Sequence, residues 1–197
     1  MDAKLIIEID SLADWTSSFG WFDGDNPGIL PPGEVNTFSE RVNGRFVASG
    51  AINANFKVEA DVRLADNNII LDVENGVIES MEVDNEYLKK MCDSLYKIEN
   101  GRKIGEIGFG SNEGIFDFVP FRSHINERVA GFHLGCGSPI QKNGYVRWTC
   151  PLHIDFISQA VDIYFDDRLV FSHGRWEQTK LSAEIDGFKP DLYVDTI

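Results

Sequence analysis

The sequence predicts a single α+β domain. Its β-sheet is expected to be mixed and mostly antiparallel, open or closed into part of a barrel, with one or two helices. Two observations predict this class: many short segments rich in alternating apolar or β-branched residues, and one segment with a clear helical period. A third observation is that no repeat, linker or low-complexity tract divides the 197 residues, so we treat residues 1–197 as one domain.

The first half of the chain reads mainly as strand. Residues 4–9 alternate in polarity, as a half-buried strand does. Asn-Gly pairs at 43–44 and 75–76 are typical of tight turns between strands. A loop is expected from Trp15 to Gly33. The other strands expected in this half are residues 45–48, 56–63, 68–73 and 77–82.

One clear helix follows, beginning near Asp84, which is a suitable N-cap. Its apolar residues repeat at helical spacing, and Asn100-Gly101 is a typical end signal. A second helix is expected over residues 126–132. The strands expected in the second half are residues 103–110, 145–148, 152–157, 161–165 and 169–172. Residues after about 181 are expected to be peripheral.

Composition excludes several classes of partner. The chain has 32 acidic and 18 basic residues, a formal charge of −14. Nucleic acids and anionic membrane surfaces require basic patches, so neither is an expected partner. No apolar run reaches the ~20 residues of a membrane span, and the N-terminus lacks the basic region of a signal peptide. Three cysteines without a CxxC pair favour a reducing compartment, so we expect a cytoplasmic protein.

The pair His153-x-Asp155 is the most informative local pattern. Side chains two apart on a strand point to the same face, so an imidazole and a carboxylate can reach one metal ion. The alternative is a buried histidine bonded to a neighbouring backbone group. A further candidate ligand, His133, lies twenty residues upstream in a glycine-rich segment.

Two carboxylates complete the candidate set. Glu34 and Glu106 each follow a glycine and precede an apolar residue, which places a carboxylate on a mostly buried strand where it requires a partner. Carboxylates and imidazoles together are ligands for zinc, cobalt, manganese or non-haem iron. Five such ligands could hold two ions about 3.5–4 Å apart around a bridging water.

Four ordered segments carry a resemblance to a known family. They are Leu30-Pro31-Pro32-Gly33-Glu34-Val35-Asn36-Thr37, Ile104-Gly105-Glu106-Ile107-Gly108-Phe109-Gly110, the stretch from Asn126 to Gly137 that contains His133, and the His-x-Asp pair. Over about residues 4–176 the chain resembles the catalytic C-terminal domain of the dinuclear metallo-aminopeptidases typified by aminopeptidase T and aminopeptidase S. The large N-terminal domain of those enzymes has no counterpart here.

The resemblance implies a divalent metal cofactor (zinc, cobalt or manganese) held by Glu34, Glu106, His133, His153 and Asp155. It implies hydrolysis of a peptide or small amino-acid derivative by metal-activated water, with Glu34 and Glu106 catalytic, and it implies a homodimer. One departure concerns the site itself. The family has a tyrosine seven residues after the equivalent of His133, where this chain has Ile140.

Two alternatives remain open. The chain is also similar to dihydroxypyridine ring-opening dioxygenases, in which His133, His153 and Asp155 would match a two-histidine, one-carboxylate iron site. The third alternative is a non-catalytic peptide-binding protein of peptide natural-product biosynthesis. In that case the aromatic residues of the opening loop form a groove wall or a dimer face; otherwise they pack in the core. They are Trp15, Phe19, Trp21 and Phe22.

Overall fold

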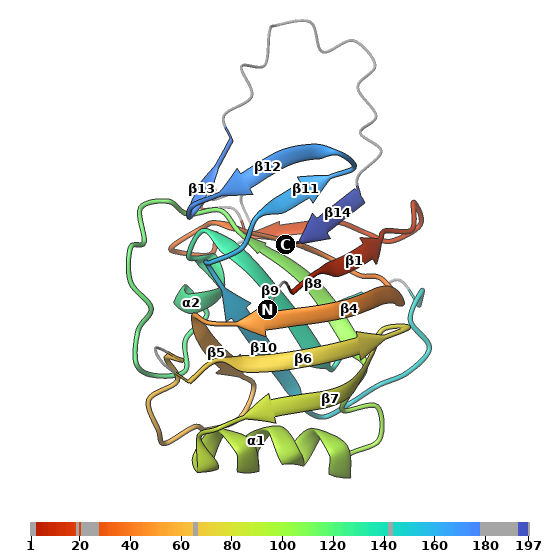
Figure 1. The fold of residues 1–197 in the computed structure, drawn as a ribbon, viewed down its shortest axis with the longest axis vertical. Helices are drawn as coiled ribbons and strands as arrows, with labels where there is room; N and C mark the ends of the chain where they lie inside the picture. Colours follow the sequence, from red (N-terminus) through yellow and green to blue (C-terminus); the bar gives the residue numbers. More distant parts are fainter. Residues whose placement is uncertain are drawn as a thin grey trace, which may run out of the picture.

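A computed structural model describes residues 3–18, 20, 28–64, 67–141, 144–177 and 193–196. The chain folds into two sheets whose named strands all pair antiparallel (Figure 1). The larger sheet has the order β13-β12-β11-β14-β1-β4-β6-β7, and the smaller has the order β2-β3-β8-β9-β10-β5. The described strands form no closed barrel, although an isolated bridge joins Val77 in the larger sheet to Lys103, next to the smaller one; the predicted mostly antiparallel α+β class is confirmed.

The larger sheet contains β1 (Leu5–Glu8), β4 (Arg41–Ala48), β6 (Ile69–Glu74), β7 (Val77–Val83), β11 (Ile163–Phe165), β12 (Arg168–Ser172), β13 (Arg175–Trp176) and β14 (Tyr193–Thr196). The smaller sheet contains β2 (Thr16–Ser18), β3 (Glu34–Thr37), β5 (Ala51–Ala54), β8 (Ile104–Gly110), β9 (Gly131–Gly137) and β10 (His153–Ser158). The helices are α1 (Glu86–Lys97) and α2 (Ile125–Arg128).

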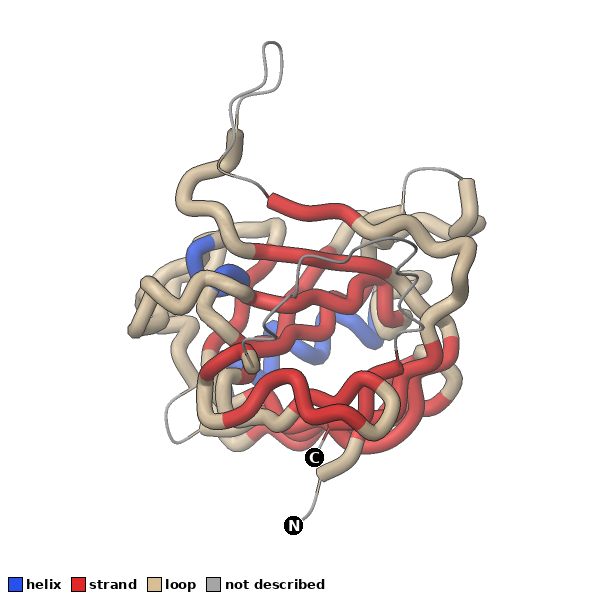
Figure 2. Tube along the Cα trace, turned by 90° about the horizontal axis from the view of Figure 1, so that it is seen from above, coloured by secondary structure: helices blue, strands red, loops and turns tan. Residues whose placement is uncertain are grey.

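The core lies between the two sheets, and Figure 2 shows strands on both sides of the interior. Phe46 of β4 meets Phe132 of β9 edge to face at 5.4 Å between ring centroids, which joins the sheets at the centre. Phe109 of β8 contacts Phe132 at 5.5 Å and also stacks on Trp15 at 6.1 Å. Trp15 thus stacks on a core residue while its own side chain stays 39% exposed. Phe19, Trp21 and Phe22 lie outside the described residues.

The helix α1 begins as its sequence indicates, with one change of cap. Asn85 rather than Asp84 is the N-cap, and its side chain accepts hydrogen bonds from the backbone N–H groups of Tyr87 and Leu88. The buried face carries Leu88, Met91, Cys92 and Leu95.

Several predicted elements were wrong. Residues 56–63 and 145–148 form no named strand, and the helix predicted for 126–132 stops at Arg128 because Gly131 and Phe132 already belong to β9. The pair 43–44 is no turn but lies inside β4. There Gly44, with φ +119°, lets the backbone of Lys4 come close. Of the residues after 181, which were expected to be peripheral, the structure describes 193–196; these form β14, which pairs with both β1 and β11 and so belongs to the larger sheet.

Candidate functional site

Four adjacent strands of the smaller sheet carry the five candidate ligands. Glu34 begins β3, Glu106 is in β8, His133 is in β9, and His153 and Asp155 share β10. The strand order β3-β8-β9-β10 therefore brings together residues that are up to 121 positions apart in the sequence. All but His153 are buried, and His133 is fully buried.

Two glycines make room for these side chains. Gly135 of β9 pairs with both Glu106 and Asp155, and a Cβ there would lie 2.7 Å from Cβ of Glu106 and 2.8 Å from Oδ1 of Asp155. Gly108 of β8 pairs with His133 and leaves the space that the imidazole ring fills. The absence of side chains at these two positions is what lets the polar groups converge on one face of the sheet.

The ligand atoms form two groups, each within 4.8 Å, that share Glu106. The first is Glu34, Glu106 and His133, in which Nε2 of His133 lies 3.8 Å from Oε1 of Glu34 and 3.6 Å from Oε1 of Glu106. The second is Glu106, His153 and Asp155, in which Nε2 of His153 lies 3.1 Å from Oε2 of Glu106 and 2.9 Å from Oδ1 of Asp155. Neither group contains both histidines.

The charges of the cluster depend on one another. Burial alone lowers the pKa of His153, but Asp155 and Glu106 outweigh it and raise that pKa to about 12. Burial likewise lowers the pKa of His133, and Glu106, Asp155 and Glu34 together raise it to about 9. Burial raises the pKa of Asp155 to about 6 although His153 opposes it, whereas the two histidines overcome burial and lower the pKa of Glu106.

Asn36 is a residue that the sequence reasoning missed. Its side-chain amide donates to Oε1 of Glu34 at 3.0 Å and to Oε1 of Glu106 at 2.8 Å, and so fixes the spacing of the two carboxylates. A signal for it was present, because Glu34 and Asn36 are two apart on a strand, like the His-x-Asp pair.

A second polar group lies beside the cluster, around the short helix α2. The buried carboxylate of Glu127 accepts from the side-chain amide of Asn53 in β5 and contacts Nδ1 of His124 at 2.9 and 3.2 Å. Buried Arg128 places Nη2 3.8 Å from Oε2 of Glu34. Glu127 and Arg128 belong to the segment quoted for the resemblance, whereas His124 precedes it; sequence spacing alone does not show that α2 turns these side chains toward the smaller sheet.

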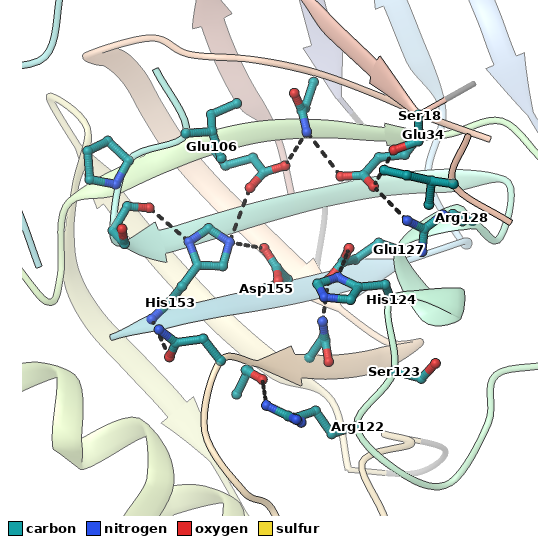
Figure 3. Close-up of a pocket in the computed structure, with 18 residues that line it drawn as sticks. Ser18, Glu34, Glu106, Arg122, Ser123, His124, Glu127, Arg128, His153 and Asp155 are labelled. Carbon is teal, nitrogen blue, oxygen red and sulfur yellow. Dashed lines mark hydrogen bonds and ion pairs between the residues drawn. The ribbon is translucent and has the colours of Figure 1, made fainter. Parts of the chain in front are cut away.

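Both groups line one pocket of about 700 Å³ (Figure 3). Glu34, Glu106, Asp155 and His153 lie along its sheet side, while His133 is buried behind them and does not line it. Ile140, the position at which the resembled family has tyrosine, is part of the wall. The pocket thus combines an acidic floor with a wall that carries Arg122, His124 and Arg128.

Comparison with known proteins identifies the family. The profile of the crocagin biosynthetic proteins CgnE/B matches residues 31–166, more than half of the chain. The chain belongs to the CgnE/B family. The matched range includes β3, β8, β9 and β10, and therefore all five candidate ligands. No curated protein sequence gives a significant match to this CgnE/B-family chain.

Two solved structures share the fold. One is 2,5-dihydroxypyridine dioxygenase from Pseudomonas putida KT2440, at TM-score 0.64 and 19% identity, covering 90% of this chain and 55% of that one. The other is AmpT, aminopeptidase T, from Thermus thermophilus, at TM-score 0.63 and 19% identity, covering 88% and 47%. This CgnE/B-family chain thus spans about half the length of either enzyme. The expected aminopeptidase likeness holds as a distant structural relationship, and the family is a different one.

The side chains present fit a divalent metal ion. Both ring nitrogens of His133 are buried without a hydrogen-bond partner, and the nearest carboxylate oxygens are too distant for hydrogen bonds. Ligand atoms about 2 Å from a zinc ion lie roughly 3–4 Å from one another, which is the spacing seen here.

Among the described residues no helix is long and apolar enough to cross a membrane.

Proposed function

We propose that this CgnE/B-family protein binds a peptide during the biosynthesis of a peptide-derived natural product, and that its pocket receives part of that peptide. The observation that carries the proposal is the size and lining of the pocket. A volume of about 700 Å³ exceeds what one or two ions and their ligands fill. Its walls also offer amide, hydroxyl, imidazole and guanidinium groups in addition to the acidic floor.

Family membership and one residue of the pocket wall support this proposal. The family is described by a biosynthetic role, not by a reaction. At the position of the resembled family's tyrosine, Ile140 offers no group that bonds a metal or an oxyanion. A pocket that binds is therefore better supported than a complete active site.

Selection from a random-peptide display library tests the proposal. Peptides that bind the purified protein should be recovered, and their affinities should fall when Asn55 and Ile29 of the pocket lining are each replaced by larger side chains. Replacement of Lys89, which lies on the solvent face of α1, is the matched control. The proposal fails if the library yields no peptide, or if the selected peptides bind the pocket variants as tightly as the wild type.

Metal-dependent hydrolysis is the second candidate, and the shared carboxylate of Glu106 favours it. In this case Glu34, Glu106 and His133 would hold one ion, and Glu106, His153 and Asp155 another. Bound zinc, cobalt or manganese would supply Lewis-acid chemistry and an activated water. Glu34 or Glu106 would accept the water's proton, and Arg128 would lie beside Glu34, with Nη2 3.8 Å from Oε2.

The iron alternative has less geometric support. Its three ligands would be His133, His153 and Asp155, yet His133 groups with Glu34 and Glu106 rather than with the pair on β10. Metal content measured by plasma mass spectrometry separates the candidates. Two equivalents of a divalent ion favour hydrolysis, one equivalent of iron favours oxygenation, and a protein that stays empty after metal addition retains only peptide binding.

A further inference from the structure

Arg122, His124 and Arg128 bring positive charge to one side of an otherwise acidic pocket. All three come from the connection between β8 and β9 and from the helix α2 within it. Figure 3 places Arg122 and His124 apart from Glu34 and Glu106, across the pocket. The protein as a whole carries a formal charge of −14, so this grouping runs against the overall balance.

His124 lines the pocket, and a contact with Glu127 orients its ring. Its side chain is 76% exposed, but both oxygens of the buried Glu127 carboxylate contact Nδ1. Asn53 donates to the same carboxylate and fixes it in turn. Because Nδ1 is occupied by Glu127, the ring is oriented and its Nε2 side is left for a ligand.

Arg122 offers the second donor group. One guanidinium nitrogen, Nη1, donates to the backbone oxygen of Ala54 at 3.3 Å, which anchors the side chain at the end of β5. A guanidinium has five N–H donors, so one anchoring bond leaves a planar fork for a second acceptor. The side chain is exposed and lines the pocket.

Arg128 extends the positive wall inward. Its side chain is 5% exposed, and its Nε atom is buried without a hydrogen-bond partner. The Nη2 atom lies 3.8 Å from Oε2 of Glu34, so the positive charge of the guanidinium faces that carboxylate.

We propose that Arg122 and His124 form a carboxylate-binding subsite at the mouth of the pocket, and that this subsite selects peptides with an acidic group. The inference rests on the proposed peptide-binding function and narrows its ligand class. An arginine fork and an oriented imidazole are donors that match a carboxylate in charge and in shape. The acidic floor favours a singly charged carboxylate over a phosphate dianion, because repulsion from Glu34, Glu106 and Asp155 grows with ligand charge.

Peptides recovered from the display library test the subsite. Each is synthesised with its terminal carboxylate amidated, and again with its aspartate or glutamate side chains converted to amides. Comparison of the two amidated forms shows whether the protein binds the terminal carboxylate or a side-chain carboxylate of the peptide. One of the two changes is expected to weaken binding about tenfold or more, as loss of a charge-assisted hydrogen bond does.

The same pairs are then measured on protein variants. Arg122→Ala and His124→Ala should bind the acid and amide forms with nearly equal affinity, and Arg122→Lys should restore only part of the preference because lysine lacks the fork. Lys89→Ala should keep the full preference. If the selected peptides bind equally well as acid and as amide, the carboxylate subsite is contradicted but peptide binding is not. The same holds if the preference for the acid form survives in both alanine variants. A library that yields no binder removes both proposals.

Discussion

Gly108 and His133 face each other in register on β8 and β9, and a Cβ at position 108 would lie 1.9 Å from Nε2 of His133. The histidine ring thus occupies the volume that any other residue at 108 would need. Since the ring is fully buried, it has no room to move aside without disturbing Glu34 or Glu106.

Gly108→Ala should therefore destabilise the protein and misplace His133. Overpacking of this kind costs about 1–3 kcal/mol of unfolding free energy, measured by urea denaturation. Gly114→Ala is the control, because the one atom beyond the chain neighbours within 4 Å of a Cβ there is the amide oxygen of Asn112, at 3.1 Å. Equal stability of Gly108→Ala and wild type would show that the ring is not confined as described.

Zinc or cobalt should stabilise the wild-type protein against heat, and His153→Ala should remove the part of that effect that comes from an ion held by Glu106, His153 and Asp155. Nε2 of His153 is the atom that joins Glu106 to Asp155, and a ligand that binds only the native state raises its stability by mass action. At a free ion concentration about 100 times the dissociation constant, the gain is about 2.7 kcal/mol. His173→Ala, outside the pocket, should keep the full effect; an unchanged metal response in His153→Ala would contradict the ligand assignment.

Metal binding should release protons and should strengthen as pH rises. With its pKa raised to about 9 by Glu106, Asp155 and Glu34, His133 carries a proton at neutral pH, and a metal ligand must lose that proton. Affinity should increase by roughly tenfold or more per pH unit through neutral pH. It should still rise above about pH 9, because His153, whose pKa is raised to about 12, must also lose its proton. Calorimetric titration in two buffers of different ionisation enthalpy counts the protons directly. Affinity that does not change between about pH 6 and pH 8 would exclude His133 as a ligand.

Arg128→Met should destabilise the apo protein by about 1–3 kcal/mol, because it removes one of the two cations, Arg128 and His133, that face the buried carboxylate of Glu34. The double variant with Glu34→Gln should recover part of that loss, so that the two changes are not additive. Arg63→Met breaks an exposed pair with Asp61 and should cost less than about 1 kcal/mol. Additive losses in the double variant would mean that Arg128 and Glu34 are not coupled.

A homodimer remains a prediction, to be tested by light scattering. Large apolar side chains are exposed on the single chain, among them Leu30 at 78% and Phe116 at 81%. Contact with a second copy would remove such side chains from water. We expect a mass of twice 22.1 kDa, and Phe116→Ser should shift the equilibrium toward monomer. A wild-type protein of 22.1 kDa at high concentration would contradict the expectation.

The sequence alone determined the elements whose pattern is local. The helix α1, the strands around Glu106 and His153, and the antiparallel α+β class follow from periodicity and turn residues, which act over a few positions. The shared orientation of His153 and Asp155 follows from the two-residue period of a strand. Local patterns gave wrong predictions where tertiary contacts decide the structure. Gly44 was predicted in a turn but lies inside β4, and Phe132 was predicted in a helix but lies in the strand β9.

Only the tertiary structure decided which distant residues meet. The order β3-β8-β9-β10 places Glu34 near His133 and Glu106 near His153, and strand order depends on packing between sheets rather than on any local signal. The turn of α2 toward the sheet adds Glu127, His124 and Arg128, none of which a sequence spacing marks as part of the pocket. The folded surroundings then set the charges. Burial raises the pKa of Asp155, whereas Glu106, Asp155 and Glu34 raise the pKa of His133 against the effect of burial.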